Sequence, residues 1–342
     1  MITLGIETSC DDTSVCLLKS FEEKNKLPEI LGHLSFSQET LLQEWGGVVP
    51  EIAARNHLAK ITPLLKQVCD QAKISPAEIN QIGITTHPGL LGPLLTGVNA
   101  AKSLSLLYKI PLNPVNHLFA HLEAIHLTKN ITYPYLGLLF SGGHSLFCLV
   151  ESPEKFKLVA STKDDAAGEA FDKGGKMLGL DYPAGKIIDE LAKAGDRQKY
   201  SFPIGLLGSK DGQMSFSGLK TALRNFIEKN NVEIGNKNNQ MMKDICASYQ
   251  EAIVTAILKK TKEVIQILKM NNSMPLVLGG GVACNSRLRE VLMENFPNVN
   301  CVDPKFCTDN GAMIANYASR TPKNNIVFPE SLKLDAKSRY IK

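Results

Sequence analysis

The sequence lacks the features that mark secreted, disulfide-stapled and membrane-spanning proteins. Its eight cysteines are scattered along the chain, and none forms a C-x-x-C pair. This spread favours buried, reduced thiols over a disulfide framework or a zinc ribbon. No apolar run approaches the roughly 20 residues that span a bilayer. The first residues show no basic segment followed by an apolar one, so we expect a cytoplasmic protein without a secretory signal or membrane segment.

The sequence also lacks a strong net charge of either sign. The 342 residues carry a formal net charge of +4, and 21% of them are charged and 44% hydrophobic. These values are ordinary for a globular protein, and they permit nucleic-acid binding without arguing for it. A chain of this length is too long for one small core, which favours two domains or one two-lobed unit.

Two segments share one pattern of strand, polar turn and strand. Residues 2–19 and 135–151 each predict a β-hairpin. Aligned without gaps, the segments carry the same residue at five places: Leu4/Leu136, Gly5/Gly137, Ser9/Ser141, Cys16/Cys148 and Leu17/Leu149. We therefore predict two copies of one α/β module.

Hydrophobic periodicity predicts further elements between and after these hairpins. The expected strands lie at 82–85 and 276–278, and the expected helices at 56–72, 244–268 and 285–294, with one more ending near 108. The polar segments 20–47 and 227–242 are predicted to be loops. Strands that alternate with helices indicate α/β lobes.

Two histidines, His117 and His121, lie four residues apart. On a helix this spacing puts both imidazoles on one face, where they can hold one divalent ion. The alternative is that they only line or cap the helix. A zinc peptidase would need a glutamate directly after the first histidine, and Leu118 stands there. The spacing leaves a metal site open and counts against peptidase chemistry.

A small polar turn follows the first strand of each predicted hairpin. Ser141, Gly142 and Gly143 would let backbone N–H groups approach phosphate oxygens closely. Asp11 and Asp12, in the other turn, can hold a metal or a water molecule. The same residue types dominate ordinary hairpin turns, which remain the alternative.

Three later stretches combine polar and apolar residues. A strand runs into Gly279-Gly280-Gly281, and Asn285 or Ser286 can cap the next helix, which suits a nucleoside or phosphate. This stretch has neither a Rossmann fingerprint nor a P-loop pattern. Four carboxylates within 164–172 predict a solvated helix face, or partly buried acids with partners. Before the last helix, Thr308 or Asp309 is the expected N-cap, and a third metal ligand is the alternative.

In their order and over nearly the whole chain, nine stretches resemble the universal tRNA threonylcarbamoyladenosine transferase family, formerly labelled O-sialoglycoprotein endopeptidases. They are LGIETSCDDT, GGVVPEIAARNH, NHLFAH, SGGH, DDAAGEAFDK, LGLDYPAG, SFSGLKTALR, GGGVACNSRLR and CTDNGAMIA. The resemblance implies an α/β, actin-like (ASKHA) duplicated two-lobe fold with the active site in the interlobe cleft. The N-terminal lobe would comprise 1–114 plus about 303–342, and the C-terminal lobe 115–302.

The resemblance also implies the site residues. His117, His121 and Asp309 match the family's metal ligands, for one divalent ion per subunit. That ion would be iron, although zinc also suits such a ligand set. The residues that match positions holding the threonylcarbamoyladenylate are Leu139, Phe140, Ser141, Gly142, Gly143, Asp172, Gly185, Asp189 and Asn285.

The implied reaction transfers threonylcarbamoyl from L-threonylcarbamoyladenylate to N6 of adenosine 37 in tRNAs reading codons that start with A, forming t6A and releasing AMP. Asp11 or Asp12 is our candidate to accept the amine proton. The implied partners are the tRNA anticodon loop and either an inactive paralogue with a small ATPase, as in bacteria, or a second copy of the chain, as in mitochondria. Lys220 and Arg224, four apart on a predicted helix, can contact tRNA phosphates or form an ordinary solvated face.

Two other classes compete with this interpretation. A small-molecule or sugar kinase on the same fold has no need of the paired histidines, and the family's inactive paralogue lacks them. The chain departs from the family pattern at His87, at Gly279 and at Ala184, where a glycine is usual. We expect the extra methyl group of Ala184 to crowd the ligand slightly.

Overall fold

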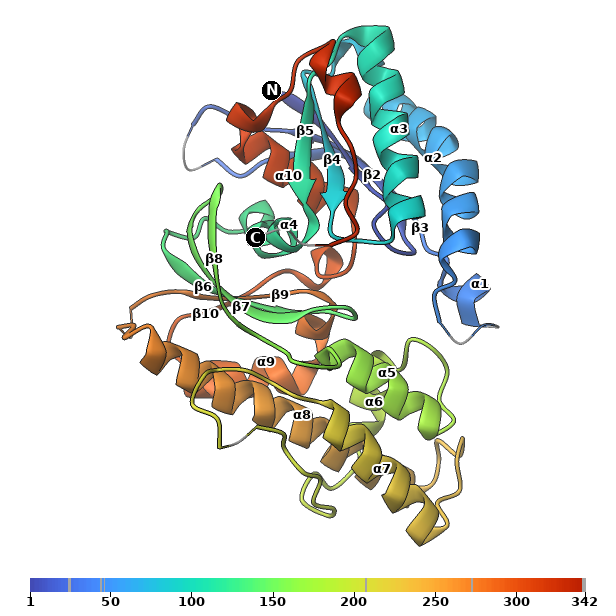
Figure 1. The fold of residues 1–342 in the computed structure, drawn as a ribbon, viewed down its shortest axis with the longest axis vertical. Coiled ribbons are helices and arrows are strands. Elements are labelled where there is room, and N and C mark those ends of the chain that lie inside the picture. The colour runs from blue at the N-terminus through green and yellow to red at the C-terminus, as the bar shows by residue number, and fades with distance from the viewer. Residues whose placement is uncertain (24–25, 44, 46, 207, 272, 340–342) are drawn as a thin grey trace. The chain divides into compact units, whose positions relative to one another are not determined.

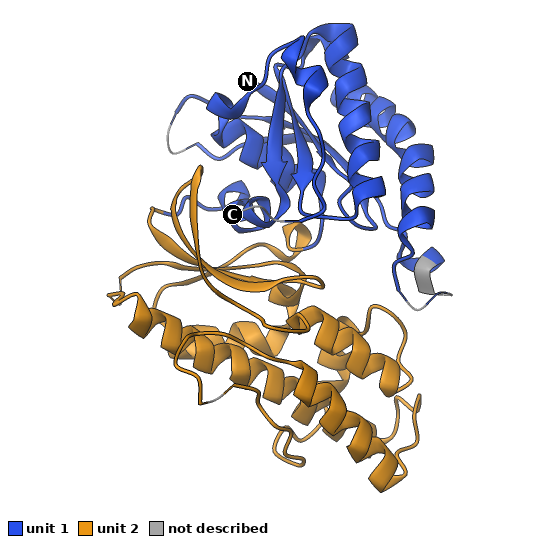
Figure 2. Ribbon diagram, viewed as in Figure 1, with its two compact units in different colours: residues 1–131, 308–342 blue, residues 132–307 orange. Residues whose placement is uncertain are grey.

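The computed structural model describes residues 1–23, 26–43, 45, 47–206, 208–271 and 273–339. They fall into two compact units, unit 1 (1–131 and 308–342) and unit 2 (132–307), shown in Figure 2. A five-stranded sheet forms the centre of each unit. Within the described ranges, no helix combines the length and the apolar character that crossing a bilayer requires.

The sheet of unit 1 is covered by helices on both faces. Its strands are β1 (Ile2–Glu7), β2 (Thr13–Lys19), β3 (Glu29–Phe36), β4 (Gln81–His87) and β5 (Leu112–Asn116). Its helices are α1 (Glu39–Gln43), α2 (Pro50–Ala72), α3 (Leu91–Tyr108), α4 (His117–Glu123) and α10 (Gly311–Arg320). The strand order is β3-β2-β1-β4-β5, antiparallel from β3 to β1 and parallel from β1 to β5. Helices α2 and α3 pack on one face and α10 on the other (Figure 1).

Unit 2 repeats this plan. Its strands are β6 (Tyr135–Phe140), β7 (Ser145–Ser152), β8 (Lys155–Ser161), β9 (Leu276–Gly279) and β10 (Val299–Cys301). Its helices are α5 (Ala167–Met177), α6 (Ala184–Ala192), α7 (Ser217–Asn230), α8 (Gln240–Ile267) and α9 (Ser286–Asn295). The order β8-β7-β6-β9-β10 reproduces that of unit 1, with the same antiparallel and parallel pairings.

The predicted duplication is confirmed at the level of strand register. In the first hairpin Gly5 pairs with Cys16, and in the second Gly137 pairs with Cys148. The identical residues seen in the sequence therefore occupy equivalent places in two copies of one module. Because a shift of one residue would turn every side chain to the other face, an equal register preserves the core-facing pattern of both copies.

The bounds of the two units differ from the lobe bounds expected from the sequence. Unit 1 extends to residue 131 rather than 114, and it resumes at 308 rather than about 303. The reason is that α4 and the 3₁₀ turn after it, Ala124–Leu127, pack on α10. Asn316 of α10 also donates a hydrogen bond to the carbonyl oxygen of Glu123 at 2.9 Å.

Two segments expected to be loops contain regular structure. The segment 20–47, of which 24–25, 44 and 46 lie outside the described residues, contains β3 and α1. The segment 227–242 contains the end of α7 and the start of α8. β3 is an edge strand whose side chains are partly exposed, so its sequence lacks the apolar run of a central strand.

Glycines in β1 and β4 allow α10 to lie directly on the sheet. A methyl group at Gly83 would lie 2.6 Å from the Cβ of Ala318 and 3.0 Å from the carbonyl oxygen of Ile314. At Gly5 it would collide with the backbone at Gly311 and Ala315. The opposite face of β1 presents larger apolar side chains to the core, among them Leu4, which is fully buried.

We predict that Gly83→Ala lowers the free energy of unfolding by about 1–3 kcal/mol or more, because overpacking forces backbone shifts. Denaturant unfolding of the purified chain measures the loss. Gly218→Ala in α7 is the control, because a methyl group there meets no neighbouring atom within 4 Å. That control should be neutral or stabilising by up to about 1 kcal/mol, since alanine favours helix. An equal loss in both variants would contradict the packing argument.

Candidate metal centre and adenylate site

Helix α4 brings two imidazoles together as the sequence predicts. The helix starts directly after β5, and Asn116 caps it by accepting hydrogen bonds from the N–H groups of Leu118 at 2.9 Å and Phe119 at 3.3 Å. His117 and His121 then lie one turn apart, with their Nε2 atoms 3.2 Å from each other. Both residues are buried, so the pair belongs to the interior of unit 1 and not to a solvated helix face.

Asp309 completes a cluster with the two histidines. Its Oδ1 atom lies 3.1 Å from Nε2 of His121 and 3.5 Å from Nε2 of His117. The expected N-cap at Thr308 or Asp309 is wrong: Asn310 caps α10 by accepting a hydrogen bond from the N–H of Met313 at 2.8 Å. With the cap one position later, the carboxylate of Asp309 faces the imidazoles. The position of Asp309 therefore fits the alternative prediction, a third metal ligand, better than it fits an N-cap.

Glu7 is a functional candidate that sequence reasoning missed. Its side chain is fully buried at the end of β1, and Oε2 lies 3.0 Å from Nδ1 of His117. The hydroxyl of Thr85 donates to the same oxygen at 2.7 Å, and the N–H of Ser9 donates to Oε1 at 2.5 Å. A carboxylate that accepts from Nδ1 directs Nε2 of the same ring toward a metal. The available signal was a charged residue that ends an apolar strand.

The electrostatics favour a cation between the three donor atoms. Burial opposes charge on both imidazoles, but Asp309 and Glu7 outweigh it at His117 and raise its pKa to about 9. At His121 burial prevails and, with the nearby charge of His117, lowers the pKa. At neutral pH the pair therefore carries one positive charge, from the additional proton on His117. The candidate ligand atoms all lie within 4.8 Å of one another, so a divalent ion can take the place of that proton.

The acidic turn after β1 lies in the same unit. Burial, reinforced by the charges of Asp309 and Asp11, raises the pKa of Asp12 to about 7. Burial and Asp309 also raise the pKa of Asp11. The Oδ1 atom of Asp12 is buried without a hydrogen-bond partner among the described residues. A partly buried carboxylate with a raised pKa and one oxygen atom without a partner is a functional-site candidate.

The predicted adenylate residues lie in unit 2, and part of them gather at the carboxyl ends of β6 and β9. Leu139 and Phe140 end β6 as buried residues. The turn Ser141–His144 follows, and the first turn of α5 approaches it so closely that a methyl group at Gly168 would lie 2.6 Å from the carbonyl oxygen of Ser141. Gly280 likewise has no room for a side chain against the backbone of Phe140. The end of β6, the glycine-containing turn after it and the N-terminus of α5 thus lie together. Backbone N–H groups in such turns and at helix N-termini favour binding of an anion.

The carboxylates of two other predicted adenylate residues, Asp172 and Asp189, each accept a hydrogen bond from an N–H group at the N-terminus of a neighbouring helix. Asp172 accepts a hydrogen bond from the N–H of Ala184 at 2.9 Å, at the start of α6, where Gly185 follows. Asp189 accepts from the N–H and the hydroxyl of Ser286 at 3.1 and 2.9 Å. That the methyl group of Ala184 crowds the ligand slightly stays a prediction. That methyl group is buried against α5, where a methyl group at Gly175 would collide with it.

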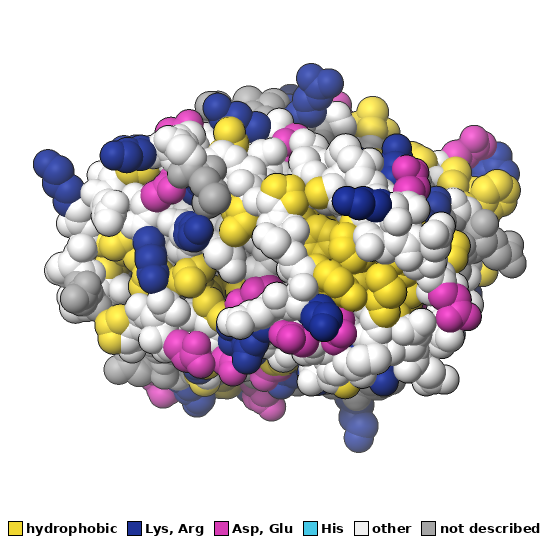
Figure 3. Space-filling view, turned by 90° about the horizontal axis from the view of Figure 1, so that it is seen from below, with side chains coloured by type: hydrophobic (Ala, Val, Ile, Leu, Met, Phe, Trp, Pro, Cys, Tyr) yellow, Lys and Arg dark blue, Asp and Glu magenta, His cyan; other side chains and the backbone are white. Residues whose placement is uncertain are grey.

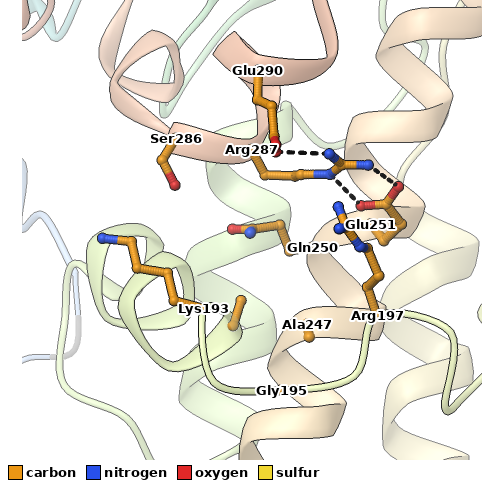
Figure 4. Close-up of a pocket in the computed structure, with 10 residues that line it drawn as sticks. Lys193, Gly195, Arg197, Ala247, Gln250, Glu251, Ser286, Arg287 and Glu290 are labelled. Carbon is orange, nitrogen blue, oxygen red and sulfur yellow. Dashed lines mark hydrogen bonds and ion pairs between the residues drawn. The ribbon is translucent and has the colours of Figure 1, made fainter.

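Asn285 is the N-cap of α9, as predicted. Its Oδ1 accepts from the N–H of Leu288 at 2.9 Å, and its Nδ2 donates to Oε1 of Gln250 at 2.6 Å. Gln250 also lines a pocket of about 200 Å³ bounded by α6, α8 and α9 (Figure 4). In that pocket Arg287 forms a two-pronged ion pair with Glu251, at 2.9 and 3.0 Å. The polar side chains in the pocket wall near Asn285 therefore form ion pairs and hydrogen bonds with one another.

The remaining carboxylate run has structural partners. Asp164 accepts hydrogen bonds from the N–H of Phe216 at 2.8 Å and the hydroxyl of Ser217 at 2.8 Å. Asp165 pairs with Lys173 at 2.9 Å and with Lys220 at 3.0 Å. The alternative of partly buried acids with partners is confirmed for Asp165, whereas Asp164 has partners but is exposed. Lys220 is thereby committed to an ion pair inside unit 2.

Comparison with known proteins agrees with this architecture. The sequence model of the TsaD family, described as tRNA N6-adenosine threonylcarbamoyltransferase, matches residues 29–316. A protein of that name from Anaeromyxobacter sp. (strain Fw109-5) is 42% identical over 321 residues, 92% of either chain. Another, from Thermosipho africanus (strain TCF52B), is 42% identical over 338 residues, which is 97% of this chain and 98% of its own.

Among solved structures, component A of the (R)-2-hydroxyglutaryl-CoA dehydratase of Acidaminococcus fermentans has a similar fold. The TM-score is 0.54 and the identity 15%, over 95% of this chain and 99% of that one. At this identity the likeness concerns the fold alone. The duplicated two-lobe α/β architecture is the actin-like fold expected from the sequence.

We predict that Glu7→Gln weakens binding of a divalent ion by about 10–100-fold, because the neutral amide no longer favours the His117 tautomer that presents Nε2. Calorimetric titration with zinc measures the affinity, and thermal unfolding verifies that the variant is folded. Glu78→Gln, which alters an exposed capping carboxylate, is the matched control and should leave the affinity unchanged. Equal affinity in the wild type and Glu7→Gln would exclude the positioning role.

Proposed function

Because the chain belongs to the tRNA N6-adenosine threonylcarbamoyltransferase family, we propose that this transferase moves threonylcarbamoyl from L-threonylcarbamoyladenylate to N6 of adenosine 37. The acceptors are tRNAs that read codons starting with A, and the products are t6A and AMP. The observation that carries the proposal is the convergence of His117, His121 and Asp309 in a chain that matches the family over nearly its whole length.

The chemistry of this reaction fixes what the protein must supply. The donor is a mixed anhydride whose carbonyl carbon is already activated, and AMP is a good leaving group. The acceptor is an exocyclic aromatic amine, which is a poor nucleophile. Catalysis therefore depends on orienting the two groups and on stabilising the negative charge that develops on the carbonyl oxygen.

His117, His121 and Asp309 would hold one divalent ion. Two imidazole nitrogens and one carboxylate oxygen leave coordination positions open, and the set suits iron, with zinc as the alternative. When bound, such an ion supplies Lewis-acid stabilisation or orientation of a substrate oxygen. Glu7 fixes the ring of His117 by accepting from Nδ1, so the donor atom stays aimed at the ion.

We assign the donor to the glycine turn and helix starts of unit 2. The phosphate would bind the exposed backbone at Gly142 and Gly143, where no side chain intervenes. Asp189 and Asn285 both accept hydrogen bonds from N–H groups in the first turn of α9. Their geometry is already fixed by hydrogen bonds to that helix, which supports a preorganised site for the nucleoside.

Asp12 is the better of the two candidate bases. Its pKa of about 7 and its unpartnered Oδ1 atom suit a group that accepts a proton near neutral pH. Asp11 accepts a hydrogen bond from the thiol of Cys10, and Asp12 accepts one from Ser37 but keeps its buried Oδ1 atom without a partner among the described residues. The amine proton of adenosine would pass to Asp12 as the new C–N bond forms.

The pH dependence follows from this assignment. A general base is active when it is deprotonated, above its pKa. Its activity is lost as the pH falls through the pKa and the group becomes protonated. The single-turnover rate should therefore fall about tenfold per pH unit below about 7 and level off above it. Asp12→Asn should lower the rate by about 10²–10⁴-fold and remove this limb. A wild-type profile that is retained in Asp12→Asn would exclude the residue as the base.

We propose that tRNA reaches the chain by its anticodon loop, with an inactive paralogue and a small ATPase, or a second copy of the chain, as helpers. Arg224 is exposed on α7 and remains a candidate for phosphate contact, whereas Lys220 is engaged by Asp165. On the face in Figure 3, basic side chains are intermixed with acidic ones. Contact on this face would rely on individual residues and not on a uniform basic area.

The decisive test is single-turnover transfer of labelled threonylcarbamoyl from the adenylate to unmodified tRNA, with and without a chelator. We expect modification at adenosine 37 that the chelator reduces and added iron or zinc restores. The double variant His117→Ala, His121→Ala should lose transfer, because the ion loses two of its three protein ligands. His33→Ala on β3 removes an imidazole elsewhere in unit 1 and should retain activity. Full activity of the double variant without bound metal would exclude the metal role.

A further inference from the structure

Helix α2 carries a buried histidine that the candidate metal centre does not use. His57 is fully enclosed, and both of its ring nitrogens contact the acidic turn between β1 and β2. Nδ1 lies 2.7 Å from the hydroxyl oxygen of Thr13, and Nε2 lies 3.1 Å from the carbonyl oxygen of Cys10. Between these two contact points stand Asp11 and Asp12. One imidazole therefore bridges the turn on both sides of its carboxylates.

The two contacts fix the protonation of the ring. A carbonyl oxygen can only accept a hydrogen bond, so Nε2 of His57 carries the proton that is donated to Cys10. Burial lowers the pKa of His57 below its usual value, which keeps the ring neutral at pH 7. Nδ1 is then an acceptor, and the hydroxyl of Thr13 donates to it. Both ring nitrogens are thereby occupied, and the ring cannot rotate without losing two hydrogen bonds.

The same helix holds the segment that lies beside this turn. β2 and β3 are antiparallel neighbours, so the residues just after β3 reach the turn, where Ser37 donates a hydrogen bond to Asp12. The next residue, Gln38, is fully buried. It donates to the carbonyl oxygen of Ala53 at 3.3 Å and accepts from Asn56 at 3.0 Å, both on α2. Helix α2 thus fixes both the turn and the neighbour of Asp12.

We propose that His57 is a positioning residue, which braces the turn between β1 and β2 so that Asp12 keeps the orientation needed to accept the proton of the adenosine amine. The proposal rests on the proposed transfer reaction and on Asp12 as its base. Among the described residues the hydrogen bonds of His57 go to Cys10 and Thr13, so it acts on Asp12 through the turn. A fixed turn matters because a general base works only within hydrogen-bond reach of the proton that it removes.

Removing the imidazole leaves polar groups of the turn without their partner. In His57→Phe the carbonyl oxygen of Cys10 and the hydroxyl of Thr13 lose a hydrogen bond, so the turn can settle in other conformations. Because a misplacement of about 1 Å can cost about 100-fold, we expect the single-turnover rate at saturating substrates to fall about 10–100-fold. The half-saturating concentrations of adenylate and tRNA should stay within about twofold, since no substrate contact is removed.

The first test compares two substitutions of the residue that donates to the ring, with thermal unfolding to verify that each variant is folded. Thr13→Val keeps the shape of the side chain but removes its hydroxyl, and it should slow transfer by about tenfold. Thr13→Ser keeps the hydroxyl and should recover most of the wild-type rate. His33→Phe on β3 removes another imidazole of unit 1 and is the matched control, with an unchanged rate. Equal rates in the two Thr13 variants would overturn the proposal.

A double-mutant cycle separates positioning from general stabilisation. The base is already missing in Asp12→Asn, so adding His57→Phe should slow that variant by less than about threefold. A merely structural histidine would lower the rate by the same factor in both backgrounds. That additive outcome would overturn the proposal.

NMR of ¹⁵N-labelled histidine supplies a measurement that needs no transfer. At pH 7 the wild type should show His57 as the neutral ring protonated at Nε2, and Thr13→Val should shift the Nδ1 resonance. A ring protonated at Nδ1 would overturn the brace and leave the proposed function intact. Wild-type protein that shows the expected ring but transfers no threonylcarbamoyl would overturn the proposed function, and this inference with it.

Discussion

A buried carboxylate at the end of β1 is the constraint on which the candidate metal centre depends. Glu7 is fully enclosed, and a carboxylate so enclosed is stable only when charged or hydrogen-bonding groups surround it. Those groups come from three places: the turn after β1, Thr85 at the end of β4, and His117 at the start of α4. Satisfying one buried charge thus ties neighbouring strand ends together. It also fixes the orientation of the histidine that faces His121 and Asp309.

The parallel pairing of β1, β4 and β5 explains why these groups meet. Carboxyl ends of parallel strands lie at one edge of a sheet, so residues far apart in sequence converge there. Close packing of α10 on the other side, which Gly5 and Gly83 permit, brings the segment before that helix to the same edge. Asp309 lies in that segment, directly before the Asn310 cap. The close packing of α10 on the sheet therefore places Asp309 at the same sheet edge as the polar groups that follow β1, β4 and β5.

The sequence was informative where burial is complete. All six interior strands were predicted, whereas the edge strands β3, β5, β8 and β10 were missed. β3, β8 and β10 have partly exposed side chains and therefore lack a continuous apolar run. β5 is mostly buried, but Asn113 and Pro114 interrupt its apolar run. The paired histidines could be inferred from helical spacing, whereas a third ligand at Asp309 was only the alternative to capping until the resemblance selected it. Glu7 was missed because its role depends on a contact across 110 residues of sequence.

The two copies of the module carry opposite chemistry at equivalent turns. The turn of unit 1 contains Asp11 and Asp12, whose carboxylates favour a cation and repel phosphate. The turn of unit 2 contains Gly142 and Gly143, whose exposed N–H groups favour an anion and offer a cation no ligand. The strand register is the same in both hairpins, but β6 and β7 pair one residue further, at Phe140 and Ser145, so the two turns differ in length as well as in side chains. A duplicated backbone can therefore carry side chains that favour a cation in one copy and exposed N–H groups that favour an anion in the other.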